Sequence, residues 1–512
     1  MRALKGVLIY IGIVLGIIVG LGLILLCVMY FVPSVRIFGI SLVKYKKTVS
    51  ADPIVLSDYE NYSDIEININ AKKVNLNVLP SEINDINYNL SLNVFGFSNE
   101  IVEYKVAKTI DIVDETLKIF LTISEPNGWI NMSNSKLDVI VPANLDYKLL
   151  VNTTSGDVAL GKTGLTSKVT GLTVNTGSGN LSLVNMGVGE DEKTLNLTSL
   201  NFNTKSGNFD LSKITNINVE NKVNLNADDG YFKFNNLNSS LDVTGNDVRI
   251  DANKINCGSD GFNVIVKNGY FNIKYLNGSV GAENTIITDN TVVDIENIVG
   301  KTGIVTIYGE VKIGTTNDQT MIENTNGRVT VNTAKDKITV KTYMGDIRVD
   351  KYLKSGKFTS VKGDIIVNST SDYVDGYSTK IENVDGLVDV ENKINLLEVK
   401  TTGRSKVKVK FGVVKDGFKS EQEAFEHKII TNKTEGSCEV LIPTDKTVYF
   451  KFTAKGNISG EISGFNGDNN YYKVEASDNP QYFPNSDYAN EENTKLNASF
   501  WFEGKIKFIG NA

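Results

Sequence analysis

The residue types that most often do chemistry in proteins are few and scattered in this chain. Histidine occurs once, as His427, and the three cysteines are Cys27, Cys257 and Cys438. Ser-His-Asp and Cys-His catalysis and most zinc sites need histidine, and no CxxC spacing is present. We therefore predict no catalytic residue, no metal site and no cofactor. A Cys257–Cys438 disulfide stays an open alternative.

Acidic residues gather with glycine and asparagine at three places that could offer oxygen ligands to calcium. These are NADDG at 226–230, GSDG at 258–261 and NGDNN at 466–470. Calcium needs several converging oxygens, and the stretches lack the glycine and aspartate offsets of the calcium-binding nonapeptide. Turn formation explains the same residues. Paired carboxylates on a β-helix face could cleave glycosides, so an enzyme acting on cell-wall polysaccharide remains an alternative.

Length and charge limit the remaining classes. The chain has 512 residues, with 53 basic and 60 acidic residues and a formal charge of −7 at pH 7. That length predicts several domains or one extended domain. Basic and acidic residues are mixed, with no long basic stripe, so we expect no nucleic-acid partner.

A membrane segment opens the chain. Residues 7–32 carry no charge, and a helix of that length exceeds the roughly 30 Å of a hydrocarbon core. A cleaved signal peptide would need a shorter apolar region and a small-residue exit site. We therefore predict an uncleaved single-pass helix in the cell membrane. Neighbouring lysines and arginines do not favour a cytoplasmic N-terminus, but long domains translocate largely regardless of charge, so we place the C-terminal domain outside.

One face of this helix is rich in glycine. Gly12, Gly16 and Gly20 are spaced by four residues. Such a face lets two helix backbones approach closely and could form a homodimer, although glycine is also common in membrane helices generally.

A repeat follows. Stretches such as VNTTSGDVAL, VNTGSGNLSL and IENTNGRVTV share one pattern: alternating apolar residues, a polar corner with glycine, and alternating apolar residues again. Alternation predicts strands with one buried face, and glycine could supply a positive φ at the corner. The corner glycines are Gly156, Gly179, Gly207, Gly230, Gly269, Gly303, Gly327, Gly345, Gly363 and Gly386.

Two observations favour stacked turns over hairpins. Self-similar units at this spacing are typical of solenoids, and no proline occurs between Pro142 and Pro443. We predict an all-β fold: an elongated parallel β-solenoid, or rack, with capped ends, preceded by one transmembrane helix. A meandering antiparallel sheet is the alternative.

The ends of the repeat differ from its body. Prolines, the two tryptophans and many tyrosines lie in the flanking segments, which suits caps, although aromatic residues could also form a binding face. The expected organisation is a cytoplasmic tail (1–6), the transmembrane helix (7–32), a juxtamembrane linker (33–51), an N-terminal β cap (52–145), the glycine-cornered repeat (146–436) and a C-terminal β cap or second small repeat (437–512).

The chain resembles a family of bacterial membrane-tethered β-strand-repeat proteins of unknown function that is labelled "putative adhesin". The residues that carry the resemblance are the N-terminal span, IEININAKKVNLNVLPSE, the step at Ile140–Pro142, and the corners at Thr154–Asp157 and Thr176–Asn180. The resemblance covers roughly residues 60–400. It implies a parallel β rack outside the cell and an association with envelope stress, and it supplies no catalytic residue.

These observations together predict a non-enzymatic, membrane-anchored surface protein. It would be an adhesin-like scaffold or an envelope-stress accessory that projects an interaction surface to an unidentified extracellular or membrane partner. Besides the polysaccharide-acting enzyme, a cytoplasmic filament-forming scaffold is the remaining alternative.

Overall fold

The computed structural model is mostly β-structure, with strands β1–β40, one long helix α1 and one 3-10 helix η1. The strands form a β-solenoid of about 11 turns, which confirms the predicted fold class. The chain divides into two compact units, Met1–Asn221 and Lys222–Ala512. The structure describes residues 2–511 except 33–35, 38–39, 51, 99–105, 124–129, 132–133, 162–164, 166–167, 184–193, 280, 370–376, 393–395, 412–424, 433–434, 444–448, 456–457, 464–470, 474–476 and 484–496.

The first unit holds the helix and the early strands. Its elements are α1 (Arg2–Phe31), β1 (Arg36–Ile37), β2 (Ile40–Ser50), η1 (Leu56–Tyr59), β3 (Asp64–Lys72), β4 (Asn75–Ser81), β5 (Asn87–Ser98), β6 (Val106–Val113), β7 (Thr116–Ile123), β8 (Ile130–Asn131), β9 (Lys136–Pro142), β10 (Asp146–Thr153), β11 (Val158–Leu160), β12 (Lys168–Thr176), β13 (Leu181–Leu183), β14 (Thr194–Leu197), β15 (Ser199–Asp210) and β16 (Asn216–Val219).

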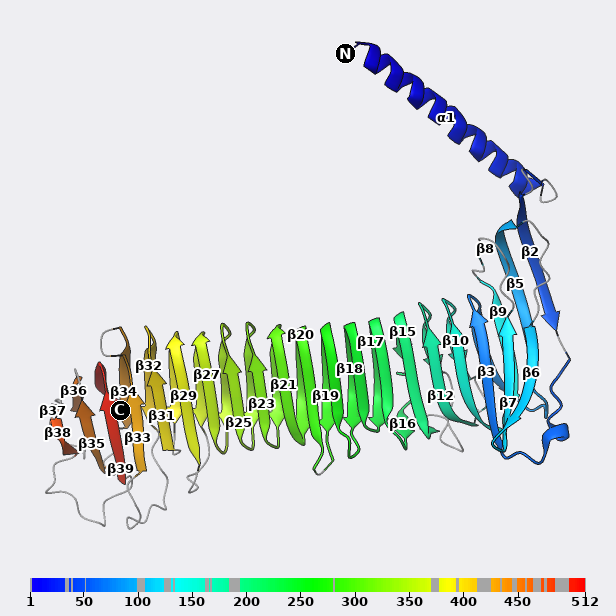
Figure 1. Cartoon of the computed structure of the whole chain (residues 1–512). Coiled ribbons are helices and arrows are strands. Elements are labelled where there is room, and N and C mark those ends of the chain that lie inside the picture. Colours follow the sequence, from blue (N-terminus) through cyan, green and yellow to red (C-terminus); the bar gives the residue numbers. More distant parts are fainter. Residues whose placement is uncertain are drawn as a thin grey trace. The chain divides into compact units, whose positions relative to one another are not determined.

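Each turn in this unit has two limbs on either side of a corner. The first limbs stack as parallel strands in the order β7, β3, β10, β12 and β15. The second limbs stack as β9, β4, β11 and β13, again in parallel, and β13 pairs with the end of β15. Figure 1 shows β3, β10 and β12 lying side by side. Parallel pairing rules out the antiparallel meander for these turns.

Antiparallel strands cover the outer edges of these two ladders. Strand β6 pairs with β7, and β5 pairs with β9, in each case antiparallel. Strand β2, in the segment expected as a linker, pairs antiparallel with β5. An uncovered edge of a parallel ladder would be free to pair with another chain, so these strands protect it. The boundaries of the N-terminal cap itself stay a prediction.

The second unit continues with strands only. They are β17 (Val223–Asn238), β18 (Leu241–Asn256), β19 (Phe262–Asn277), β20 (Glu283–Val299), β21 (Lys301–Tyr308), β22 (Val311–Thr316), β23 (Thr320–Asn324), β24 (Val329–Ala334), β25 (Ile338–Thr342), β26 (Ile347–Tyr352), β27 (Gly356–Lys362), β28 (Ile365–Ser369), β29 (Ser378–Asp385), β30 (Leu387–Asn392), β31 (Leu396–Thr401), β32 (Lys406–Phe411), β33 (Phe425–Ile430), β34 (Ser437–Pro443), β35 (Tyr449–Lys455), β36 (Ile458–Ser463), β37 (Tyr471–Lys473), β38 (Ser477–Phe483), β39 (Asn497–Glu503) and β40 (Ile506–Asn511).

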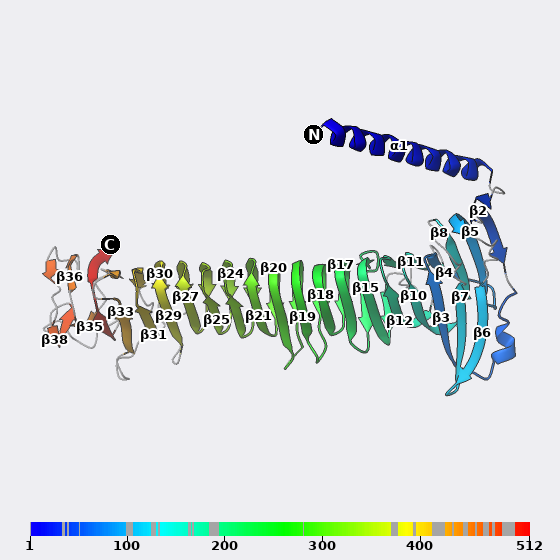
Figure 2. The same cartoon turned by 45° about the horizontal axis from the view of Figure 1, so that its top comes forward.

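Strands β17–β20 each run through both limbs of a turn and pair in parallel, in sequence order. Beyond β20 each limb is a separate strand: odd-numbered β21–β31 carry the first limb and even-numbered β22–β32 carry the second. Figure 2 follows this stack within the second unit. Its C-terminal strands leave the sequence order, because β39 lies between β33 and β35. At the margin β37 pairs antiparallel with β36, and β38 pairs antiparallel with β35.

Alternating side chains fill the interior of each turn. The column Val264, Ile286, Ile304, Ile322 and Val340 repeats on successive first limbs, and all five are fully buried. Asparagine ladders reinforce the register: Asn256 donates to Asn238 over 2.5 Å, and Asn277 donates to Asn256 over 2.8 Å. The asparagine side chains face each other only when neighbouring strands pair in this register. A shift of one residue would break the asparagine hydrogen bonds and would turn the buried column toward solvent.

Candidate interaction surface

Glycine sits at the corner between limbs because the neighbouring turn leaves no room for a side chain. A β-carbon on Gly179 would collide with the carbonyl oxygen of Gly156, and one on Gly207 with that of Gly179. In the second unit Gly309 stands against the carbonyl oxygen of Thr291, and from there each corner glycine meets the glycine of the turn before, in the order Gly309, Gly327, Gly345, Gly363 and Gly386. The predicted positive φ is therefore wrong as a general reason: among the predicted corner glycines it holds for Gly386 alone, at 144°.

Two predicted corners differ from this pattern. Gly303 lies inside β21, and nothing comes within 4 Å of a β-carbon added there. Gly309, with a φ of 113°, holds the corner of that turn instead. Gly230 would meet side chains, those of Ala227 and Phe232, rather than a backbone carbonyl.

A buried polar side chain marks most corners and lies three residues before the glycine, although Val266 and Ala227 stand at that place before Gly269 and Gly230. At several corners it bonds to the corner backbone, whereas Thr204 Oγ1 before Gly207 has no such bond with a described residue. The amide of Gly179 donates to Thr176 Oγ1 over 2.7 Å, and that of Gly327 donates to Asn324 Oδ1 over 2.9 Å. This signal could have been read from the sequence. Gly309 has Thr306 three residues before it, whereas Gly303 has Gly300 at that place, so a requirement for Ser, Thr or Asn would have selected Gly309 as the corner.

An exposed apolar patch covers first limbs and corners of the second unit. Ile265, Ile287 and Val305 are register partners on three successive turns and are 56%, 41% and 42% exposed. Ile307 and Tyr308 extend the patch to the corner of β21. We define the apolar patch by its eight exposed members: Ile265, Ile287, Val305, Ile307, Tyr308, Met321, Tyr343 and Met344. Clustered exposed apolar side chains mark interaction sites more often than scattered ones do.

Charged residues bound this patch along the same column. Val305 pairs in register with Glu323, Glu323 with Lys341, and Lys341 with Thr359. The column thus changes from β-branched apolar residues to charged and polar residues between the turn of β21 and the next turn, that of β23. An apolar centre with a polar rim is the anatomy of a protein–protein contact.

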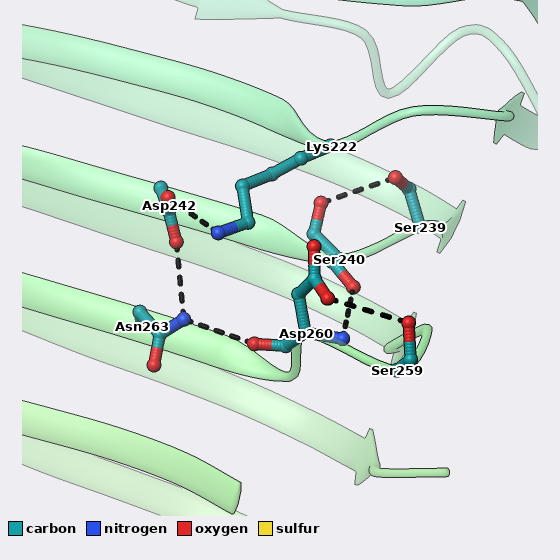
Figure 3. A network of polar contacts seen from close by, with 7 residues as sticks. All are labelled: Lys222, Ser239, Ser240, Asp242, Ser259, Asp260 and Asn263. Atoms are coloured by element: carbon teal, nitrogen blue, oxygen red, sulfur yellow. Dashed lines mark hydrogen bonds and ion pairs between the residues drawn. The ribbon is translucent and has the colours of Figure 1, made fainter. Parts of the chain in front are cut away.

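Two of the three acidic stretches considered for calcium make hydrogen bonds within the fold. Asn246 Nδ2 donates to Asp228 Oδ1 over 2.9 Å, in the 226–230 stretch. In the 258–261 stretch the amide of Asp260 donates to Ser240 Oγ and Ser259 donates to Asp260 Oδ1 (Figure 3). Among the residues that the structure describes, no group of three or more His, Cys, Asp and Glu is placed to hold a metal. The stretch 466–470 lies outside the described residues.

A larger polar network joins the starts of β17, β18 and β19. Lys222 Nζ lies 2.8 Å from Asp242 Oδ2, and Asn263 Nδ2 donates to Asp242 Oδ1 over 3.1 Å and to the carbonyl of Asp260 over 3.0 Å. Figure 3 shows these contacts linking neighbouring turns. Both oxygens of the Asp242 carboxylate already have partners, which makes the network a brace between turns rather than a ligand site.

The cysteines of the second unit are buried and unpaired. Cys257 and Cys438 are both free, which answers the alternative of a disulfide between them. Burial raises the pKa of the Cys257 thiol to about 12, and burial together with Glu439 raises the pKa of Cys438 still further. Both therefore stay protonated and unreactive at neutral pH, because the thiolate is the nucleophilic form.

The N-terminal helix is long and apolar enough to cross a membrane. The qualifying stretch is Tyr10–Phe31, with a mean hydropathy of 3.1. Nothing lies within 4 Å of a β-carbon added to Gly12, Gly16 or Gly20. Their face is therefore uncovered within the described chain, and the homodimer it could form stays a proposal.

Comparisons with curated proteins and with solved structures give only distant likenesses. No curated protein matches the chain. Two solved structures are similar to it. A "putative cell adhesion protein" from Clostridium sporogenes has 10% identity and a TM-score of 0.23, over 46% of this chain and 100% of that one. A "putative adhesin" from Parabacteroides merdae has 11% identity and a TM-score of 0.17, over 62% and 96%. These scores are low, and neither likeness carries a conclusion about what this chain binds.

The family comparison is more specific. Residues 64–273 match the family model described as Toastrack DUF4097. The matched segment begins at the first strand of the parallel ladder, β3, and ends within β19. It contains the corners at Gly156 and Gly179 and most of the sequence on which the predicted resemblance rests. Residues 64–273 are therefore a Toastrack DUF4097 segment, and the predicted family resemblance is confirmed.

Proposed function

We propose that this chain is a non-enzymatic, membrane-anchored scaffold of the adhesin type, whose apolar patch docks a protein partner outside the cell membrane. The observation that carries the proposal is the row of exposed Ile265, Ile287 and Val305 on adjacent turns. Three β-branched side chains on a solvent-facing sheet cost free energy unless something covers them.

The form of the patch favours a protein surface as the partner. Parallel strands present a nearly flat face, and a second sheet or a helix can pack on it along the column. The patch also contains tyrosine and methionine, which are enriched in the buried centres of protein interfaces. These residues are Tyr308, Met321, Tyr343 and Met344. The rim contains Glu323 and Lys341, which would stay hydrated and set orientation more than affinity.

Helix α1 supplies the proposed anchor. Its apolar stretch is long enough to span a hydrocarbon core, and the solenoid follows it in the sequence. A tag at the C-terminus of the full chain tests the topology in intact cells. Added protease should remove the tag if the solenoid lies outside, and a tag that survives until the cells are lysed would contradict this orientation.

Site-specific cross-linking tests the docking face. A photo-reactive amino acid in place of Val305 should join the full chain to one discrete partner in living cells. The same replacement at Thr359, two turns beyond Glu323 in the same column, is the matched control and should give no such product. Equal products from both positions, or none from either, would count against the patch.

Adhesion supplies an independent readout. Cells that produce the full chain should be retained on a layer of like cells, and Ile287→Lys or Val305→Lys should lower retention about tenfold by burying a charge in the contact. Thr359→Lys adds the same charge outside the patch and should leave retention unchanged. Retention that does not depend on production of the chain would overturn the adhesive role.

A further inference from the structure

A second surface of the same unit has a different chemistry. On the second limbs of β17, β18 and β19, Tyr231, Arg249 and Tyr270 are register partners on three successive turns. The guanidinium carbon of Arg249 lies 5.7 Å from the centroid of the Tyr231 ring and 5.8 Å from that of Tyr270. The arginine is therefore held between two aromatic rings, on a limb that the apolar patch does not occupy.

The rings position the guanidinium and leave its donors available. Arg249 makes no hydrogen bond or ion pair with any residue that the structure describes. A guanidinium presents a planar fork of N–H donors that matches a carboxylate or a phosphate in a bidentate way. Because cation–π contacts already restrict the side chain, an anion that binds it loses less conformational entropy on binding.

Three further cations lie on the same three strands. Lys233, Lys254 and Lys274 make no ion pair with a described residue, and Lys274 Nζ sits 5.4 Å from the centroid of the Tyr275 ring. Of the carboxylates on these strands, Asp251 accepts hydrogen bonds from Tyr231 and Asn272 over 3.1 and 3.3 Å, and Asp229 and Asp247 are register partners two residues before Tyr231 and Arg249. Lys233, Lys254 and Lys274 thus stand beside Arg249 without an ion pair to a described residue, which leaves them able to pair with an anionic ligand.

Aromatic faces and amides point to a sugar polymer as that anion. Tyr270 and Tyr275 are each 37% exposed, and the apolar face of a sugar ring packs on such rings. Asn253 and Asn272 carry amide groups, which donate to and accept from hydroxyls. Tyr231 and Tyr270 are two turns apart, about 10 Å at the usual strand spacing, which is close to the length of a disaccharide. Because Arg249 fills the gap between the rings, no nucleic-acid base can insert there.

We infer that Tyr231, Arg249, Tyr270, Lys274 and Tyr275 form a binding site for an acidic polysaccharide, with Arg249 pairing to its carboxylates and the tyrosine rings packing on its sugars. One linear polymer would lie across the successive turns, from β17 to β19. The carboxylates Asp294 and Glu296 on β20 limit the site at its far side.

Binding of polygalacturonate to the detergent-solubilised full chain tests the site. It should be measured beside two matched probes: the methyl-esterified polymer, which keeps the sugar and loses the charge, and polyphosphate, which keeps charge and has no sugar. We expect polygalacturonate to bind best. Arg249→Gln and Tyr270→Leu should each weaken its binding about tenfold, and Tyr270→Phe should not.

The control variant is Lys408→Gln. Lys408 stands in the same register column as Lys233, on β32 far along the stack, and its replacement should leave binding unchanged. Circular dichroism of each variant verifies folding. Polyphosphate or single-stranded DNA binding as tightly as polygalacturonate would overturn the inference, as would tight binding of the neutral ester or no binding of polygalacturonate. None of these outcomes depends on the apolar patch, which the Val305 cross-linking tests separately.

Discussion

The carbonyl oxygen of Gly327 occupies the space that a β-carbon on Gly345 would need. The same relation joins Gly345 to Gly363 and Gly363 to Gly386, so the corner of each turn rests directly on the backbone of the turn before. Thr342 Oγ1 donates to the carbonyl of Gly345 over 2.7 Å from inside the turn. The backbones of successive corners are therefore in close contact and leave no room for a side chain.

This packing makes Gly345→Ala destabilising. The added methyl must push two turns apart, and overpacking of this kind costs about 1–3 kcal/mol. Gly303→Ala is the matched control, because a β-carbon there meets nothing within 4 Å. The midpoint of urea unfolding of the full chain, followed by circular dichroism, should fall for Gly345→Ala and stay within error for Gly303→Ala. Equal effects would contradict the carbonyl contact as the reason for the glycine.

A second prediction concerns Tyr352, which is fully buried on β26. Its hydroxyl and Thr379 Oγ1 share a hydrogen bond of 2.6 Å, and its ring meets Phe358 edge to face at 5.5 Å. Tyr352→Phe should destabilise the fold by about 1–3 kcal/mol, because the buried Thr379 hydroxyl loses this partner. Adding Thr379→Val should recover part of that loss in urea unfolding. A double variant as unstable as the sum of the single ones would show that the bond does not couple the two residues.

Alkaline pH should weaken the second unit through Cys257. Burial raises the pKa of this thiol from its ordinary value of 9.0 to about 12. A raised pKa contributes stability that is complete below the unfolded value and is lost as pH rises through the folded value, so the loss falls between about pH 9 and 12. In this window Cys257→Ala should show a shallower fall in unfolding free energy, by about 1.4 kcal/mol per pH unit. Parallel pH profiles for both proteins would contradict the shift.

The same burial predicts how the thiols react. A maleimide reagent at neutral pH should leave Cys257 and Cys438 unmodified in the folded chain and label both after denaturation, because neither forms a thiolate in the fold. Mass spectrometry of the labelled peptides separates the two sites. Rapid labelling of either residue in the native chain would show that its turn opens locally.

The glycine face of α1 yields a prediction about association. If Gly12, Gly16 and Gly20 form the contact of a homodimer, replacing all three with leucine should lower cross-linking of the full chain in lipid bilayers about tenfold or more. Gly22→Leu changes a glycine outside the four-residue spacing and serves as the control. Equal cross-linking in the wild-type chain and both variants would remove the helix from any dimer contact.

Much of the fold could be predicted from local sequence because alternation and corner residues are local signals. The period of two in stretches such as IENTNGRVTV fixes which side chains are buried, and Ile322, Val329 and Val331 are indeed fully buried. Absence of proline across the repeat indicated continuous ladders, and the parallel pairing confirms it. The apolar stretch before the repeat identified α1 for the same reason, since hydropathy is a property of the segment itself.

The surfaces could not be predicted in this way. Ile265, Ile287 and Val305 are separated in sequence, and each alone reads as one apolar residue in a strand. Only the register of β19, β20 and β21 sets them side by side. Arg249 likewise gains its position from Tyr231 and Tyr270 on other turns.

The sequence by itself determined the type of element, the buried face of each strand and the presence of an apolar helix, because these depend on neighbours a few residues away. The tertiary structure alone decided why glycine is needed, that Gly309 rather than Gly303 holds its corner, and which exposed residues meet. Those outcomes depend on the number of residues in each turn, which sets what lies above what, and no single repeat contains that information.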